Sequence, residues 1–438
     1  MSKLSKFFRS PGEFWRDFLV KRYPGDIDGV GQEHRRATRA PANGSAPAQP
    51  LEAYPVTFPV DVVYTWVDGD DPAWLARKNS AQEKTVQVTE AATTAARFSC
   101  RGELMYSLRS IEYYAPWVNH IYIVTDRQVP QWLDTDNDKV TVVDHTEIIP
   151  PQYLPTFNSH VIEAHLHRIP GLAEHYVYFN DDVMLTRPIT PEHFFAANGN
   201  AHLFLTRSQT PVGSITIYDT PTQVAAKNAR ELLSQRFDQY MLYNFAHTFH
   251  PQLKSVNARM AEEFASAIAG FCTNRFRGRT DVAVVTYLAP NYMYLSGRGD
   301  LRTTRWVYFS VRSPFAVRHY RALLRWKGTA HAPHSMCLND IKVMGASDEA
   351  LLLRETEFLQ RYFPVPSSFE KPAEMLAGAM CEGEADSAIV TPIESADEPQ
   401  TARSSDPPIF APTSPDERPA SRESSTLLVG GTGLKKTA

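Results

Sequence analysis

Two adjacent carboxylates, Asp181 and Asp182, are the residues of this chain whose placement most clearly suggests chemistry. They follow Tyr176-Val-Tyr-Phe-Asn180, a short aromatic and β-branched run that is typical of a buried strand. In an open α/β sheet, ligands bind at the carboxyl ends of strands. Two acids there could hold a hard divalent cation, which prefers oxygen ligands and often shares them with substrate phosphates. The alternative is an acidic turn, since Asn-Asp dipeptides form turns readily.

Three further segments repeat the pattern of an apolar strand that ends in an acid: residues 60–71, 121–126 and 140–144. Downstream, His334-Ser-Met-Cys-Leu-Asn-Asp340 places an amide and a carboxylate beside a histidine. The sequence has no Gly-x-Gly-x-x-Gly or Walker-A glycine loop, so dinucleotide and P-loop chemistry are disfavoured. The pattern favours metal-bridged recognition of a diphosphate.

The elements that must position these residues predict an α/β fold. Four strands, with helix-patterned stretches between several of them, indicate a mostly parallel sheet flanked by helices. We expect a nucleotide-type α/β domain, with a helical lobe inserted over the sheet. Residues 282–294 are β-branched and aromatic enough to suit a strand, with a helix as the alternative. Apolar spacing predicts helices at residues 103–114, 159–167, 219–243, 255–271 and 351–362.

Composition bounds the organisation of the chain. With 438 residues and 43% hydrophobic content it can bury a sizeable core, which we assign to one domain at residues 55–370. Residues 23–54 are rich in Pro, Gly, Ala and Gln and predict a linker, and residues 371–438 predict a disordered tail. The net charge of −4 gives no general electrostatic case for nucleic-acid binding. Four scattered cysteines favour a reduced, intracellular state. Nothing in the sequence specifies an oligomeric state.

The first 22 residues combine six basic side chains with interleaved aromatic and leucine residues. This pattern predicts a basic amphipathic helix that contacts an anionic membrane surface, or that docks on the domain by the same aromatic face. No apolar run is long enough to span a bilayer, and the N-terminus lacks the features of a secretion signal. We therefore expect a cytoplasmic protein, with peripheral contact to the inner face of the plasma membrane through residues 1–22.

Four ordered sequence blocks resemble those of the Stealth proteins, which are bacterial capsular polysaccharide phosphotransferases related to the catalytic subunit of animal N-acetylglucosamine-1-phosphotransferase. The resemblance extends over residues 55–370, and several ordered matches are more specific than any single one. The blocks are Asp61-Val-Val-Tyr-Thr-Trp-Val-Asp68; Arg101-Gly-Glu103 through Asn158 and Glu163 to Asn180-Asp-Asp182; His247-Thr-Phe-His250 with Arg275-Phe-Arg277 and Asp281; and Cys337-Leu-Asn-Asp340.

The resemblance implies that residues 55–370 form a phosphotransferase domain. Its α/β fold would have the nucleotide-sugar-transferase-like form (GT-A or Rossmann-like). Its reaction would move a sugar-1-phosphate from a nucleotide diphosphosugar, typically a UDP-sugar, to a hydroxyl of an acceptor glycan. UMP would leave and the sugar C1–O bond would stay intact. Such a reaction requires charge neutralisation on the diphosphate, in-line positioning and a base. The alternative is a metal-dependent glycosyltransferase that forms a glycosidic bond and releases UDP.

Four residues are predicted to carry the chemistry. Asp182 is the first candidate for a metal ligand, with Asp340 completing a site for Mg²⁺, or for Mn²⁺ in its place. The family pattern brings Glu163, His247 and Arg277 into the active site. We favour Glu163 as the base and His247 as a partner of the phosphate or transition state, with the reverse as the alternative. Arg277 could clamp a phosphate bidentately. We expect Asp181 to orient the turn, with a solvated turn acid as the alternative.

Seven residues are predicted to bind substrate. Tyr64, Trp66 and Asp68 could hold the donor uridine at a strand end, the alternative being a core strand. Asp68 stands where the animal relatives carry Asn, which leaves its contact open. The others are Arg101 for phosphate, Asn158 and His160 for sugar hydroxyls, and Asn339 beside the metal.

Overall fold

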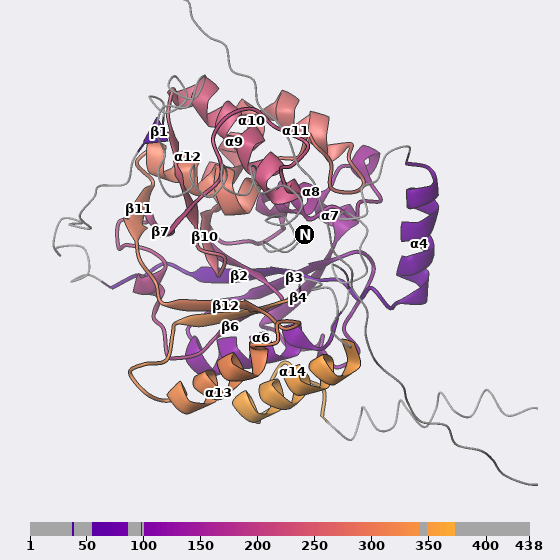
Figure 1. The fold of residues 1–438 in the computed structure, drawn as a ribbon, viewed down its shortest axis with the longest axis vertical. Helices are drawn as coiled ribbons and strands as arrows, with labels where there is room; N and C mark the ends of the chain where they lie inside the picture. Colours follow the sequence, from indigo (N-terminus) through magenta and orange to yellow (C-terminus); the bar gives the residue numbers. More distant parts are fainter. Residues whose placement is uncertain (1–36, 39–54, 86–97, 99, 341–347, 373–438) are drawn as a thin grey trace, which may run out of the picture. The chain divides into compact units, whose positions relative to one another are not determined.

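The computed structural model describes residues 37–38, 55–85, 98, 100–340 and 348–372 (Figure 1). These residues belong to one compact unit. The predicted amphipathic segment 1–22, nearly all of the linker 23–54 and the predicted tail beyond residue 372 lie outside the described residues.

The central sheet has five strands in the order β10-β5-β2-β3-β4. Strands β5, β2, β3 and β4 run parallel, and β10 pairs antiparallel at one edge. The predicted α/β fold with a mostly parallel sheet is therefore confirmed, because each of the four apolar runs found in the sequence is one of the parallel strands. The bounds are β2 Val60–Thr65, β3 Ile121–Thr125, β4 Val140–Asp144, β5 His175–Asn180 and β10 His250–Leu253.

A second sheet begins directly after β5 and has the order β12-β13-β6. Its strands are β6 (Val183–Leu185), β12 (Trp306–Ser310) and β13 (Ser335–Asn339). Strand β13 pairs antiparallel with β6 and parallel with β12. Only Asp181 and Asp182 separate β5 from β6, so the acid pair is the connection between the two sheets.

A third sheet joins β11 (Gly299–Arg302), β7 (Ala201–Gln209) and β9 (Tyr243–Phe245). Two short strands, β1 (Ala37–Thr38) and β8 (Tyr240–Met241), pair parallel.

Helices lie on both sides of these sheets (Figure 1). Near the β6 side lie α6 (Glu103–Tyr114), α13 (Ala316–Trp326) and α14 (Asp348–Tyr362). In α6 the apolar residues at helical spacing are buried, which confirms the predicted helix. The helical lobe on the other side consists of α9 (Pro221–Phe237), α10 (Lys254–Glu263), α11 (Ala265–Cys272) and α12 (Ala289–Leu295). The remaining helices are α4 (Pro72–Glu83), α7 (His145–Ile148) and α8 (Ser159–Glu163).

For residues 282–294, the prediction of a strand is wrong and the alternative, a helix, is confirmed. The segment forms a π-helix at Val284–Leu288 that continues into α12. Most side chains of both helices are buried, and a helix buried on every face has no polar positions to reveal its period. The helix expected at 219–243 ends at Phe237, where Asp238 takes a left-handed conformation with φ 55°.

The other helical predictions hold with changed bounds. Residues 159–167 form α8 and a short 3₁₀ turn, residues 255–271 form α10 and α11, and residues 351–362 lie within α14. Among the described residues, no helix combines the length and apolar character needed to cross a bilayer.

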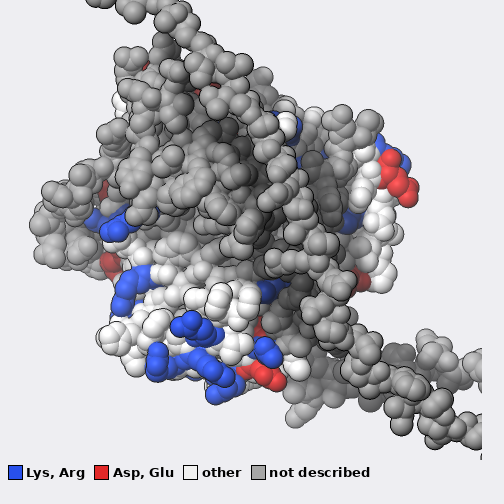
Figure 2. All heavy atoms as spheres, in the orientation of Figure 1, with Lys and Arg blue, Asp and Glu red and all other residues white. Residues whose placement is uncertain are grey.

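Basic side chains gather over the end of the molecule where α13 lies (Figure 2). Helix α13 carries exposed Arg318, Arg321 and Arg325 at spacings of three and four residues, which places them on neighbouring turns.

Candidate active site

Asp182 is held at the junction of the two sheets by the last three residues of β13, Cys337 to Asn339. Its backbone carbonyl accepts a hydrogen bond from the Leu338 amide at 3.0 Å. Its side-chain Oδ2 accepts from the Cys337 thiol and from the Asn339 amide, each at 3.3 Å. The other oxygen, Oδ1, is buried and has no hydrogen-bond partner. Asp182 therefore keeps one carboxylate oxygen available for a ligand.

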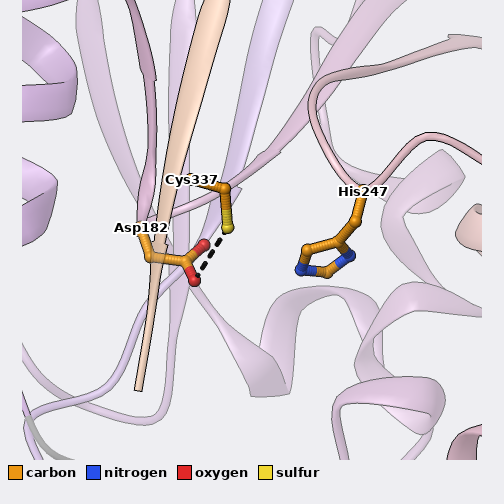
Figure 3. Close-up of side chains that lie close together, drawn as sticks. All are labelled: Asp182, His247 and Cys337. Carbon is orange, nitrogen blue, oxygen red and sulfur yellow. Dashed lines mark hydrogen bonds between the residues drawn. The ribbon is translucent and has the colours of Figure 1, made fainter. Parts of the chain in front are cut away.

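His247 approaches the same carboxylate from the connection between β9 and β10 (Figure 3). The ligand atoms of Asp182, His247 and Cys337 all lie within 4.8 Å of one another. The His247 ring also meets the edge of the Tyr308 ring, with centroids 5.4 Å apart. These three side chains form a cluster that could hold a divalent cation.

Several acidic groups lie close together around this cluster. Burial raises the pKa of Asp181 well above its usual value, and the charges of Asp182 and Glu103 raise it further. Burial, followed by the charge of Asp182, likewise raises the pKa of the Cys337 thiol, which therefore stays protonated and donates a hydrogen bond to Asp182. A cation bound beside these acids would favour their ionised forms.

Asp340 lies just beyond β13, two residues after Leu338, so the sheet register brings it to a strand end beside that of Asp182. Its oxygens accept hydrogen bonds from Arg101 at 2.8 Å and from Arg312. Burial alone would raise the pKa of Asp340, yet Arg312 and Arg101 outweigh burial and hold it below its usual value. Both predicted metal ligands thus reach the same region, but Asp340 is engaged by arginines.

Arg101, predicted to contact phosphate, is the centre of an ion-pair network. It pairs with Glu103 at 2.8 Å, with Glu355 of α14 at 2.9 Å and with Asp340 at 2.8 Å. Its guanidinium is therefore committed to three carboxylates in this structure.

Glu163 and Arg277 lie near the hydroxyl of Tyr178 in β5. Burial raises the pKa of Tyr178 strongly; the Glu163 and Asp181 charges add to the rise, and Arg277 opposes it. Arg277 donates to the Ser159 hydroxyl at 2.7 Å, and Glu163 ends the same helix, α8, with a buried Oε2 that lacks a partner. The structure thus ties Arg277 to the first residue of α8 and places Glu163 at its last residue.

Asn158 and His160, predicted to bind sugar, are both buried against Asp281. The Asn158 amide donates to Asp281 Oδ2 at 2.9 Å, and His160 Nδ1 lies 3.0 Å from the same oxygen. Asn158 also caps α8 by accepting a hydrogen bond from the His160 backbone. Their hydrogen bonds hold the start of α8, the helix that carries Glu163.

The three predicted donor-binding residues, of which Tyr64 lies in β2 and Trp66 and Asp68 follow it, have different surroundings. Tyr64 is fully buried and its hydroxyl lies 2.7 Å from Ser107, and the Trp66 indole donates to Cys100 Sγ at 3.3 Å. Asp68 is half-buried in a turn, where Oδ1 accepts from the Asp70 backbone. Among the three, Asp68 has the most accessible position.

Sequence reasoning did not assign roles to Glu103, Arg312 or Glu355. The sequence signal for Glu103 was its position at the start of a predicted helix beside Arg101. Arg312 and Glu355 carry no local signal, because their partners Asp340 and Arg101 are 28 and 254 residues away along the chain.

Comparison with known proteins agrees with the first two of the four sequence blocks. Residues 58–85 match the model of Stealth conserved region 1, and residues 97–203 match that of conserved region 2. The chain is 40% identical to capsular polysaccharide phosphotransferase LcbA of Aeromonas hydrophila over 78% of this chain and 94% of that protein. It is 39% identical to capsular polysaccharide phosphotransferase fcs1 of Haemophilus influenzae, with the same two shares covered.

Among solved structures, the galactosyltransferase LgtC in complex with donor and acceptor sugar analogs aligns with 72% of this chain and 99% of its own, at 11% identity and a TM-score of 0.36. The family follows from the sequence relatives, which match nearly their whole length at about 40% identity. The chain belongs to the Stealth family of capsular polysaccharide phosphotransferases.

Proposed function

We propose that this protein transfers a sugar-1-phosphate from a UDP-sugar to a hydroxyl of an acceptor glycan, in the synthesis of a capsular or other cell-surface polysaccharide. The observation that best supports this proposal is the Asp182 carboxylate. Its Oδ1 is buried without a hydrogen-bond partner at the carboxyl end of β5. A carboxylate oxygen in that position suits a cation bound to a diphosphate.

In the proposed reaction the acceptor oxygen attacks the phosphorus attached to the sugar. A new P–O bond forms to the acceptor, the P–O bond to UMP breaks, and the acceptor proton passes to a base. The sugar C1–O bond is not broken. Arg277, adjacent to α8, would hold a phosphate oxygen of the donor.

Two residues compete for the role of base. Glu163 lies near Tyr178 and Arg277, whereas His247 lies beside Asp182. We assign the proton to Glu163, whose Oε2 is buried without a hydrogen-bond partner, and a contact with the transferred phosphate to His247.

Asp182 would hold a Mg²⁺ ion, with Mn²⁺ as a substitute. The bound ion would neutralise charge on the diphosphate. The donor set agrees with this role at Asp182, whose partnerless oxygen lies next to Asp181. Asp340 would join as a ligand by giving up hydrogen bonds from Arg101 and Arg312.

For the substrates, we keep Asp68 as a contact to the donor nucleotide and Asn339 as an amide that positions Asp182. We place the reaction in the cytoplasm, with residues 1–22 resting on the inner membrane face.

The test is incubation of the purified protein with a panel of UDP-sugars, Mg²⁺ and acceptor glycans. Release of UMP together with a phosphodiester-linked product is expected. UDP with a glycosidic product would instead identify a glycosyltransferase. Arg277→Ala should lower UMP release by roughly 10²-fold or more while the fold is kept, and unchanged activity would exclude the proposed phosphate contact.

A further inference from the structure

The cluster around Asp182 contains ligand types that Mg²⁺ does not favour. Mg²⁺ takes oxygen ligands, whereas imidazole and thiolate suit Zn²⁺ and related transition metals. Asp182 supplies an oxygen, His247 a nitrogen and Cys337 a sulfur, all within 4.8 Å of one another. Three protein ligands of these types, with a further position left for water or substrate, are the pattern of an open zinc site.

The separations agree with this pattern. Cys337 Sγ lies 3.3 Å from Asp182 Oδ2. Two ligands at about 2.3 Å and 2.0 Å from a tetrahedral ion stand roughly 3.5 Å apart. The partnerless Oδ1 of Asp182 belongs to the same carboxylate, and Figure 3 shows the His247 ring directed toward the Cys337 side of the cluster.

We propose that Asp182, His247 and Cys337 form a binding site for Zn²⁺ and similar thiophilic divalent cations, and that occupation of this site inhibits the transferase. On binding, the Cys337 thiol gives its proton to solvent and its sulfur bonds to the metal. Inhibition follows because the metal occupies the Asp182 carboxylate and His247 at once. The inhibition rests on the proposed function, but the metal binding does not.

The binding test uses the full chain after removal of metal by a chelator. Co²⁺ is titrated as the probe and the absorption spectrum is recorded, because a Co–thiolate bond gives a sulfur-to-metal charge-transfer band. Equilibrium dialysis measures Zn²⁺ bound per chain. The variants are Cys337→Ser, His247→Gln and, as a matched control, Cys272→Ser, which removes a buried cysteine at the end of α11.

We expect the wild-type protein and Cys272→Ser to show the band and to bind one Zn²⁺ at this site. Cys337→Ser should lose the band, and each cluster variant should weaken Zn²⁺ binding at least about 10-fold. A band that persists in Cys337→Ser, or that disappears in Cys272→Ser, overturns the site. Circular dichroism of each variant confirms that the fold is kept.

The inhibition test adds Zn²⁺ to the Mg²⁺-containing UMP assay. Wild-type activity should fall as Zn²⁺ occupies the site, and Cys337→Ser should need at least about 10-fold more Zn²⁺ for half inhibition of its own activity. Equal sensitivity overturns the inhibitory role. If the wild-type protein releases no UMP in any condition, the proposed function fails, while the Co²⁺ and dialysis results still decide the metal site.

Discussion

Asp182 and Asp340 lie at neighbouring strand ends, yet their surroundings are opposite. Asp340 accepts hydrogen bonds from two arginine side chains, which balance its charge. Among the described residues, the Asp182 carboxylate accepts hydrogen bonds only from a thiol and an amide, and one of its oxygens has no hydrogen-bond partner. A carboxylate that is compensated within the protein stabilises the fold, whereas one that is not compensated is suited to a ligand.

The largest expected effect comes from removing the uncompensated charge. Asp182→Asn should lower UMP release by roughly 10³-fold, because the cation would lose its anionic ligand. The unfolding midpoint should not fall, since the described residues give Asp182 no cationic partner to lose. Steady-state kinetics and thermal unfolding of the same preparation check both parts. Near-normal activity would remove Asp182 from the mechanism.

Removing an arginine partner of Asp340 should instead lower the stability of the fold. Arg312→Met leaves Asp340 with one arginine, and the side chains of this pair are each only 8% exposed. Removal of one partner of a buried pair costs about 3 kcal/mol or more. Urea unfolding should show this loss, and the double variant Arg312→Met with Asp340→Leu should recover part of it. A loss below about 1 kcal/mol would show that the pair is effectively solvated.

Asn158→Ala distinguishes a structural role from a sugar contact. The substitution removes hydrogen bonds to the buried Asp281 and the cap of α8, and should cost roughly 1–3 kcal/mol of unfolding free energy. If Asn158 also binds sugar hydroxyls, the KM for donor or acceptor should rise in the folded protein. A changed KM with unchanged stability would contradict the structural role assigned to it here.

Asp181→Asn should produce the smallest and most pH-dependent change. The pKa of Asp181 is raised by burial and by Asp182 and Glu103, so the folded state holds this proton more tightly than the unfolded chain. Its stabilising contribution is therefore full below the unfolded pKa, near 3.9, and is lost as pH rises through the folded pKa. Above that range the variant should be more stable than wild type.

Unfolding curves across pH without divalent cations measure this difference. Added Mg²⁺ should narrow the gap between the two proteins, because a bound cation stabilises the ionised form of Asp181. A variant that is less stable than wild type at every pH would contradict the assignment.

Local patterns in the sequence were sufficient for the parallel strands, which stand out as short apolar runs such as residues 60–65, and for α6, whose buried face leaves a helical period in residues 103–114. They were insufficient at residues 282–294, where burial on all faces removes that period. The acid pair and the block ending at Asp340 could be identified as separate candidates. Their distances and the arginine partners of Asp340 depend on the register of β13 against β6, which no local pattern encodes.

The contacts of Arg101 have a consequence for how the protein is made. Arg101 is synthesised early, but its partners Asp340 and Glu355 emerge from the ribosome only when the described part of the chain is nearly complete. Until residues 340 and 355 have been synthesised, a nascent polypeptide has only Glu103 of the three carboxylates that pair with Arg101. A transcript that stopped ahead of Glu355 would therefore encode a protein in which this ion-pair network is incomplete.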